Sequence, residues 1–200
     1  MPLAVSITSA IISWKWTDNT AIRGMLVAAI IVIGLAGYFV SQRLAERNVD
    51  KFKYKTPEGQ LQIREAITKF ISHGQDAAIF SRDLTWVNDE VLDMLKRKAI
   101  SGELALFMPR PVPLSEALVE SGAVAYYYGD LFSDPNSYDG IPRFTLVRPN
   151  TDNSELAFGN RRGDVHKIYY SRDSSDPALS LAKDIYRFIR HSVNPIIKTP

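Results

Sequence analysis

The pattern of apolar and polar positions divides the chain into two parts. Residues 24–41 form an uncharged run, GMLVAAIIVIGLAGYFVS, with Arg23 before it and Arg43 after it. At about 1.5 Å per residue this run just spans the hydrocarbon core of a bilayer, so we predict a transmembrane helix. Residues 1–23 contain too few apolar residues to cross and are expected to lie in the membrane interface, with a second, strained span as the alternative.

The rest of the chain alternates amphipathic stretches with short apolar runs. Apolar residues recur at helical spacing after Pro57, Asn88 and Pro113, and each stretch ends near a glycine. Between these helices, continuous apolar runs predict buried strands at 77–80, 104–108 and 124–128. Buried strands that alternate with helices are typical of a parallel sheet covered on both faces.

The last third of the chain has a different pattern. Three close strands are predicted at 143–147, 155–158 and 165–170, with turn residues between them. Pro177 then starts a last amphipathic helix. The predicted fold is therefore α/β, a mixed but mostly parallel sheet with helices on both faces, preceded by one transmembrane helix.

The predicted segments give the domain organisation and its orientation. The boundaries are an interfacial segment at 1–23, the span at 24–41, a basic juxtamembrane linker that continues the helix at 42–55, the α/β domain at 56–192 and a tail at 193–200. Two cations, Lys15 and Arg23, precede the span, whereas five follow it closely: Arg43, Arg47, Lys51, Lys53 and Lys55. Because cytoplasmic flanks are enriched in Lys and Arg, we expect the domain on the cytoplasmic side of the cell (inner) membrane.

Composition excludes several classes of function. The 24 Lys and Arg nearly balance the 22 Asp and Glu, and neither half of the domain is strongly basic, so no nucleic-acid partner is expected. The chain has no cysteine, which excludes disulfides, thiolate zinc sites and a cysteine nucleophile. Three scattered histidines predict no metal site, and the absence of nucleotide-binding motifs predicts no cofactor.

Charged residues follow the three predicted parallel strands. Strand 77–80 runs into Arg82 and Asp83, the next strand into Arg110, and the third into Asp130. Ligands of open α/β sheets bind beyond these strand ends, and arginine suits phosphate or carboxylate groups. One interpretation is a crevice for an anionic ligand. The other is that Arg82 pairs with a neighbouring acid and ties the loops together.

The strand exit at 81–86 (SRDLTW) and the hairpin at 143–159, together with the order of elements, resemble a phospholipase D-like domain. The resemblance covers one repeat, roughly residues 56–192. The family's signature is H-x-K-x-x-x-x-D, in which the histidine forms a phospho-histidine and the lysine binds phosphate. Here Arg143, Thr145 and Asn150 occupy the His, Lys and Asp positions.

The resemblance implies a degenerate site without the family's nucleophile. It implies a membrane-tethered, non-catalytic module that binds an anionic or phosphorylated ligand, or a protein partner. The ligand-binding residues would be Arg82, Asp83, Arg110, Arg143, Thr145 and Asn150. Single repeats of this family often pair across a shared cleft, which allows a homodimer here.

An alternative alignment uses a different histidine. His166-Lys167, with Asp173 seven residues after the histidine, resembles a damaged copy of the same signature. On this interpretation the protein is an active phosphodiesterase or phospholipase with His166 as nucleophile. The lysine comes one residue early, however, and on a strand its side chain points to the opposite face from His166.

Overall fold

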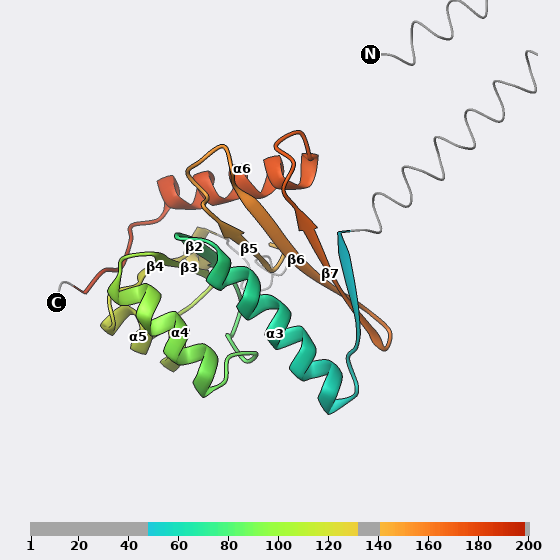
Figure 1. Ribbon diagram of the computed structural model, residues 1–200. Helices are drawn as coiled ribbons and strands as arrows, with labels where there is room; N and C mark the ends of the chain where they lie inside the picture. The colour runs from blue at the N-terminus through green and yellow to red at the C-terminus, as the bar shows by residue number, and fades with distance from the viewer. Residues whose placement is uncertain (1–47, 132–140, 199–200) are drawn as a thin grey trace, which may run out of the picture. The chain divides into compact units, whose positions relative to one another are not determined.

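The computed structural model describes residues 48–131 and 141–198, and within them seven strands form one mixed sheet (Figure 1). The strand order is β1-β7-β6-β5-β2-β3-β4. The strands are β1 (Val49–Lys53), β2 (Ala77–Phe80), β3 (Leu104–Met108), β4 (Val124–Tyr127), β5 (Phe144–Val147), β6 (Glu155–Arg162) and β7 (Val165–Ser171). The interfacial segment and the span predicted at 1–23 and 24–41 lie outside the described residues. Among those described, no helix has the length and apolar character needed to cross a bilayer.

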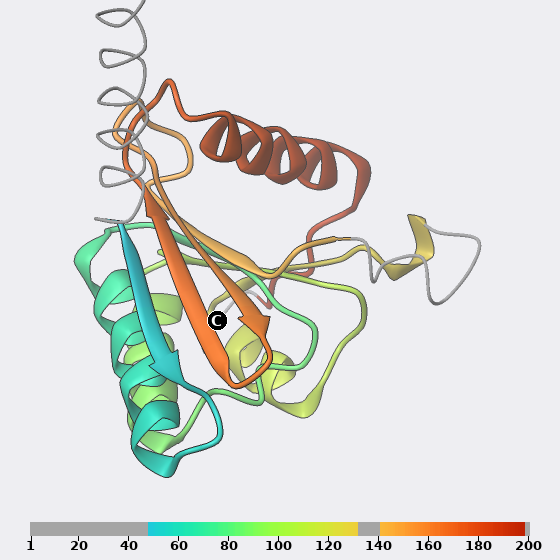
Figure 2. The same cartoon turned by 90° about the vertical axis from the view of Figure 1, so that its right-hand side faces the viewer.

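Helices cover both faces of the sheet, as predicted (Figures 1 and 2). The helices are α3 (Pro57–His73), α4 (Asp89–Ile100), α5 (Pro113–Glu120) and α6 (Pro177–Ser192), with a short 3-10 turn, η1 (Gly129–Leu131). Alternate residues of β2 show the two layers: Ile79 packs in the cluster with α4 and α5, and Phe80 packs in the cluster with α6. Each strand side chain therefore faces one of two helical layers.

The helices begin at the residues that the sequence predicted. The side chain of Thr56 accepts a hydrogen bond from the Gly59 amide, and that of Asn88 accepts one from the Val91 amide. These caps satisfy amides that the first turn of a helix leaves unpaired. Pro113 and Pro177 stand at or next to the first helical position.

The prediction that the sheet is mostly parallel is wrong, because most of its strand pairs are antiparallel. Only β2–β3 and β3–β4 are parallel among the pairs in the described residues. The pairs β1–β7, β7–β6, β6–β5 and β5–β2 are antiparallel. The short turns that join β5, β6 and β7 leave no room for the crossover that parallel neighbours need, so these strands pair as a meander.

The prediction that residues 42–55 continue a helix is wrong over Val49–Lys53, which form the edge strand β1. β1 pairs antiparallel with β7, and beyond its end the Tyr54 amide donates to the Asp164 carbonyl at 2.9 Å. Phe52 and Tyr54, two residues apart, pack against the cluster beneath α3. The sheet therefore includes Val49–Lys53, which precede the predicted start of the domain at residue 56.

The predicted C-terminal tail also contributes to the sheet. Ile196 forms an antiparallel bridge with Ala125 of β4, with backbone hydrogen bonds of 2.8 and 3.0 Å. Lys198 forms an ion pair with Glu120 of α5 at 2.7 Å. The residues after α6 thus cover part of the second sheet edge.

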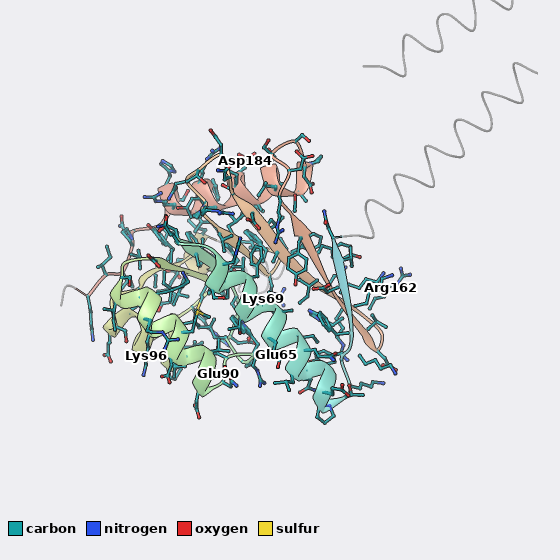
Figure 3. The ribbon with its side chains drawn as sticks, viewed as in Figure 1. Glu65, Lys69, Glu90, Lys96, Arg162 and Asp184 are labelled. Carbon is teal, nitrogen blue, oxygen red and sulfur yellow. The ribbon has the colours of Figure 1, made fainter. Side chains whose placement is uncertain are left out.

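Charged side chains mark the outer faces of the helices. Figure 3 shows Glu65 and Lys69 on α3, and Glu90 on α4, on the side away from the sheet. Asp184 is exposed on α6, and Arg162 is exposed near the tip of the β6–β7 hairpin. The inner face of α3 instead packs on β5, β6, β7 and β1, which defines the roof of the cavity described next.

Candidate functional site

A cavity of about 290 Å³ lies between the first half of α3 and the sheet. Its walls come from α3, the end of β2 with the loop after it, the start of β5, and parts of β6 and β7. Tyr54, which joins β1 to α3, adds a further wall. The cavity therefore includes the carboxyl end of β2, one of the three strand ends at which the sequence predicted a ligand crevice.

The strand register explains why a cavity forms here. Gly159 of β6 pairs with Ile168 of β7. Because Phe144 pairs with both Phe158 and Phe80, the next positions along these strands place Arg143 between Gly159 and Ser81. The adjoining row contains Thr145 opposite Ala157. Four of these positions, which form the floor of the cavity, have small side chains (Gly159, Ala157, Thr145 and Ser81), so space remains beneath α3 although Ile63 packs in one cluster with Ala157 and Ile168.

Two arginines line the cavity from opposite layers. Arg64 belongs to α3, and its Nε donates to the Trp86 carbonyl at 3.1 Å, which fixes its guanidinium over the loop after β2. Arg143 precedes β5, and its side chain is 54% exposed. Its Nη2 lies 3.9 Å from a carboxylate oxygen of Asp83, which is 42% exposed, so this pair is weak and Arg143 remains able to bind a ligand.

The loop after β2 has a fixed conformation. Leu84 adopts φ +56°, a conformation that costs a non-glycine residue roughly 1–2 kcal/mol. Its side chain is buried, its amide donates to the Ser81 hydroxyl at 3.3 Å, and its carbonyl accepts from the Val87 amide at 3.0 Å. These contacts hold the loop so that Thr85 and Trp86 line the cavity.

His166 lines the cavity from β7. Both ring nitrogens are buried and have no hydrogen-bond partner among the described residues. The ring stacks on Tyr54 at a centroid distance of 6.2 Å, and a Cβ at Gly159 would come within 2.8 Å of its Nε2 atom. Burial lowers the pKa of His166, and the nearby charge of Arg161 lowers it further, so the imidazole is neutral at pH 7.

Part of the predicted site converges on this cavity. Arg143 and Thr145 line it, and Asp83 contacts Arg143. Arg82 is half-buried in the same loop but does not line the cavity. Arg110 is exposed after β3 and is also absent from the cavity wall.

Asn150 has a different environment, at the other end of β5. Its side-chain oxygen accepts hydrogen bonds from the Tyr186 hydroxyl and from Arg190, each at 3.1 Å, which joins the β5–β6 turn to α6. The predicted signature positions thus divide between two ends of the strand. Arg143 and Thr145 lie at the cavity, and Asn150 lies at the α6 contact.

The alternative pair, His166 and Asp173, is separated along β7. β7 ends at Ser171, and the five steps of strand from His166 to Ser171 alone correspond to about 17 Å at roughly 3.3 Å per residue. Asp173 instead accepts hydrogen bonds from the Ser175 amide at 2.9 Å and hydroxyl at 2.8 Å, and these bonds lower the pKa of its carboxyl group. Lys167 lies on the opposite face of β7 from His166, because alternate strand residues face opposite sides.

Sequence reasoning missed Arg64 and Tyr54. Arg64 lies seven residues before the fully buried Ile71 and three before Ile67, so helical spacing places it on the apolar face of α3. A cation on an apolar face is a usable signal for a buried polar site. In the described residues, no group of three or more His, Asp or Glu side chains is arranged to hold a metal ion.

Comparison with known proteins assigns no family. No protein-family model matches the sequence, and no curated protein matches it. Among solved structures, the chain is similar to the crystal structure of polyphosphate kinase from Porphyromonas gingivalis, with 14% sequence identity and a TM-score of 0.44. The match covers 72% of this chain and 23% of the kinase chain. Similarity at this level establishes neither a family nor an activity.

Proposed function

We propose that this protein is a membrane-anchored, non-catalytic module whose cavity binds an anionic, phosphorylated ligand. The observation that carries the proposal is the convergence of Arg64 and Arg143 on one cavity from two layers of the fold. Hydroxyl groups of Ser81, Thr85 and Thr145 line the same cavity, and none of the described residues that line it is Asp or Glu. Arginine forks and hydroxyl donors together suit phosphate oxygens.

We further propose that the domain is phospholipase D-like with a degenerate site. Support comes from Arg143 and Thr145, which line the cavity beside Gly159 at the positions where the resemblance expects the catalytic histidine and lysine. A guanidinium stays protonated at any working pH and cannot act as a nucleophile. Threonine at the lysine position has no positive charge to bind phosphate.

The membrane anchor and the cytoplasmic location are proposed from the sequence. The apolar run at 24–41 and the cations that follow it support both. A homodimer and a protein partner remain part of the proposal.

The proposal is tested by phosphate binding to the full chain in detergent micelles. Inorganic phosphate should raise the melting temperature and change the fluorescence of Trp86. Arg64→Gln and Arg143→Gln should each weaken binding by about 10- to 150-fold, the equivalent of one charge-assisted hydrogen bond at roughly 1.5–3 kcal/mol. The matched control is Arg162→Gln, an exposed arginine outside the cavity wall. Absence of binding, or an equal loss in the control, would refute the proposal.

An active phosphodiesterase is the second candidate. His166 favours it, because a neutral imidazole lines the same cavity as two arginines. Its ring nitrogens are buried, however, and Asp173 lies two residues beyond the end of β7. Hydrolysis of a chromogenic phosphodiester by the wild type, lost in His166→Ala, would establish the enzyme and exclude the non-catalytic module.

A further inference from the structure

The cavity has a polar side and an apolar side. The polar side lies over β5 and β2, where Arg143 and Ser81 form the floor and Arg64 contacts the loop after β2. The more apolar side lies over β6 and β7, although the ring of His166 also lines the cavity there. There Ile63 of α3 packs in one cluster with Ala157 and Ile168. The division follows from the register, because Gly159 separates Arg143 from Ile168 within one row of the floor.

A phosphate ion alone would use only the polar side. Its oxygens would reach the two arginines and the hydroxyl groups, and water would remain against the aliphatic part of the wall, to which Ile63 contributes at 9% exposure. Removing that aliphatic surface from water is favourable, so a ligand that fills both sides binds more tightly. At about 290 Å³ the cavity lies near the lower end of the range for small-molecule sites, which favours a compact organic group.

The charges of the cavity wall distinguish between kinds of phosphate ester. Arg64 and Arg143 are the cations among the described residues that line the cavity, and His166 adds none at pH 7. A phosphate monoester carries about −1.5 to −2 at pH 7, whereas a diester carries one negative charge. Two guanidinium groups therefore match a monoester better than a diester.

We propose that the ligand is a phosphate monoester with a compact apolar organic group. Its phosphate lies between Arg64 and Arg143, and its organic group lies against the aliphatic part of the wall that includes Ile63. This inference rests on the proposed function, since it specifies the ligand class of the same cavity.

The test is isothermal titration of the full chain in detergent micelles at pH 7.5 with three probes. Phenyl phosphate should bind at least tenfold more tightly than inorganic phosphate. Methyl phenyl phosphate, a diester of similar shape, should bind more weakly than phenyl phosphate. Ile63→Thr should reduce the advantage of phenyl phosphate over inorganic phosphate, while Ile100→Thr, at a position 75% exposed and outside the cavity wall, should keep it.

The outcomes separate this inference from the function on which it rests. If inorganic phosphate binds in an Arg143-dependent way but phenyl phosphate binds no more tightly, the organic group is refuted and anion binding stands. If the diester binds as tightly as the monoester, the monoester preference is refuted. If no probe binds, or if binding is unaffected by Arg64→Gln, both the proposed function and this inference fail.

Discussion

Lys98 of α4 should hold the end of α3, the helix that carries Arg64. The Lys98 side chain is buried, at 9% exposure. Its Nζ donates to the carbonyl oxygens of Gly74 at 2.6 Å and of Gln75 at 2.7 Å. Gly74 has φ −92°, so α3 ends without a left-handed glycine cap, and the ammonium group satisfies carbonyls just beyond the helix.

The change Lys98→Met keeps an unbranched side chain of nearly the same length and removes the ammonium group. Two hydrogen bonds from a charged donor contribute about 1.5–3 kcal/mol each, or roughly 3–6 kcal/mol together. Relief of the desolvation of a buried charge offsets part of this loss. The contact with Glu103 at 3.4 Å is partly exposed and adds little. We therefore expect the free energy of unfolding to fall by about 2–4 kcal/mol.

The assay is urea unfolding of the full chain in mild detergent, followed by circular dichroism. Lys96→Met is the matched control, because Lys96 is on the same helix and is only half-buried (Figure 3). The control should change stability by less than about 0.5 kcal/mol. A Lys98→Met variant as stable as this control would refute the role of the ammonium group, since the two carbonyls would then have other partners.

Three further changes test other contacts. Gly59→Ala should cost about 1–3 kcal/mol, measured as a lower melting temperature, because a Cβ there would overlap a carbonyl oxygen at the end of β1. His166→Gln tests the pH dependence of stability. Burial, and to a smaller extent the charge of Arg161, lowers the pKa of His166 in the folded state, so the unfolded chain takes up the proton at a higher pH than the folded chain. The wild type should therefore lose stability as pH falls through about 6.5, and its melting temperature should drop more between pH 7.5 and 5.5 than that of the variant. Glu155→Gln removes a buried carboxylate that pairs with Arg148 and Arg172. It should lower the free energy of unfolding, measured in urea, by about 1–2 kcal/mol, a modest loss because both arginines are partly exposed. Equal pH responses in wild type and His166→Gln, or a Glu155→Gln variant of unchanged stability, would contradict these expectations.

Elements with local signals were predictable from the sequence. Thr56 and Asn88 cap their helices through contacts with residues three positions later, so the signal is complete within one helical turn. The buried strands β2 and β3 follow from continuous apolar runs bounded by turn residues. Such segments depend little on the rest of the fold.

Elements whose stability comes from distant partners were not predictable. β1 contains Asp50, Lys51 and Lys53, and only Phe52 marks its buried face before Tyr54. Its pairing partner, β7, lies more than a hundred residues later in the sequence. The spacing of basic residues therefore favours a juxtamembrane helix, whereas in the structure Lys51 and Lys53 lie on the edge strand β1, where charge also discourages pairing with other chains.

The cavity was also not predictable from local sequence, because the strand register brings its residues together and they form no contiguous motif. Ser81 follows β2, Arg143 precedes β5, and Gly159 and Ile168 lie within β6 and β7, so the four residues are far apart in the sequence. A shift of β5 by one residue would turn Arg143 and Thr145 to the α6 face and bring Phe144 beneath α3. The observed register is held where Phe144 stacks on Phe80 at 4.0 Å between ring centroids, on the face opposite the cavity. The aromatic packing under α6 thus determines which residues a ligand would meet under α3.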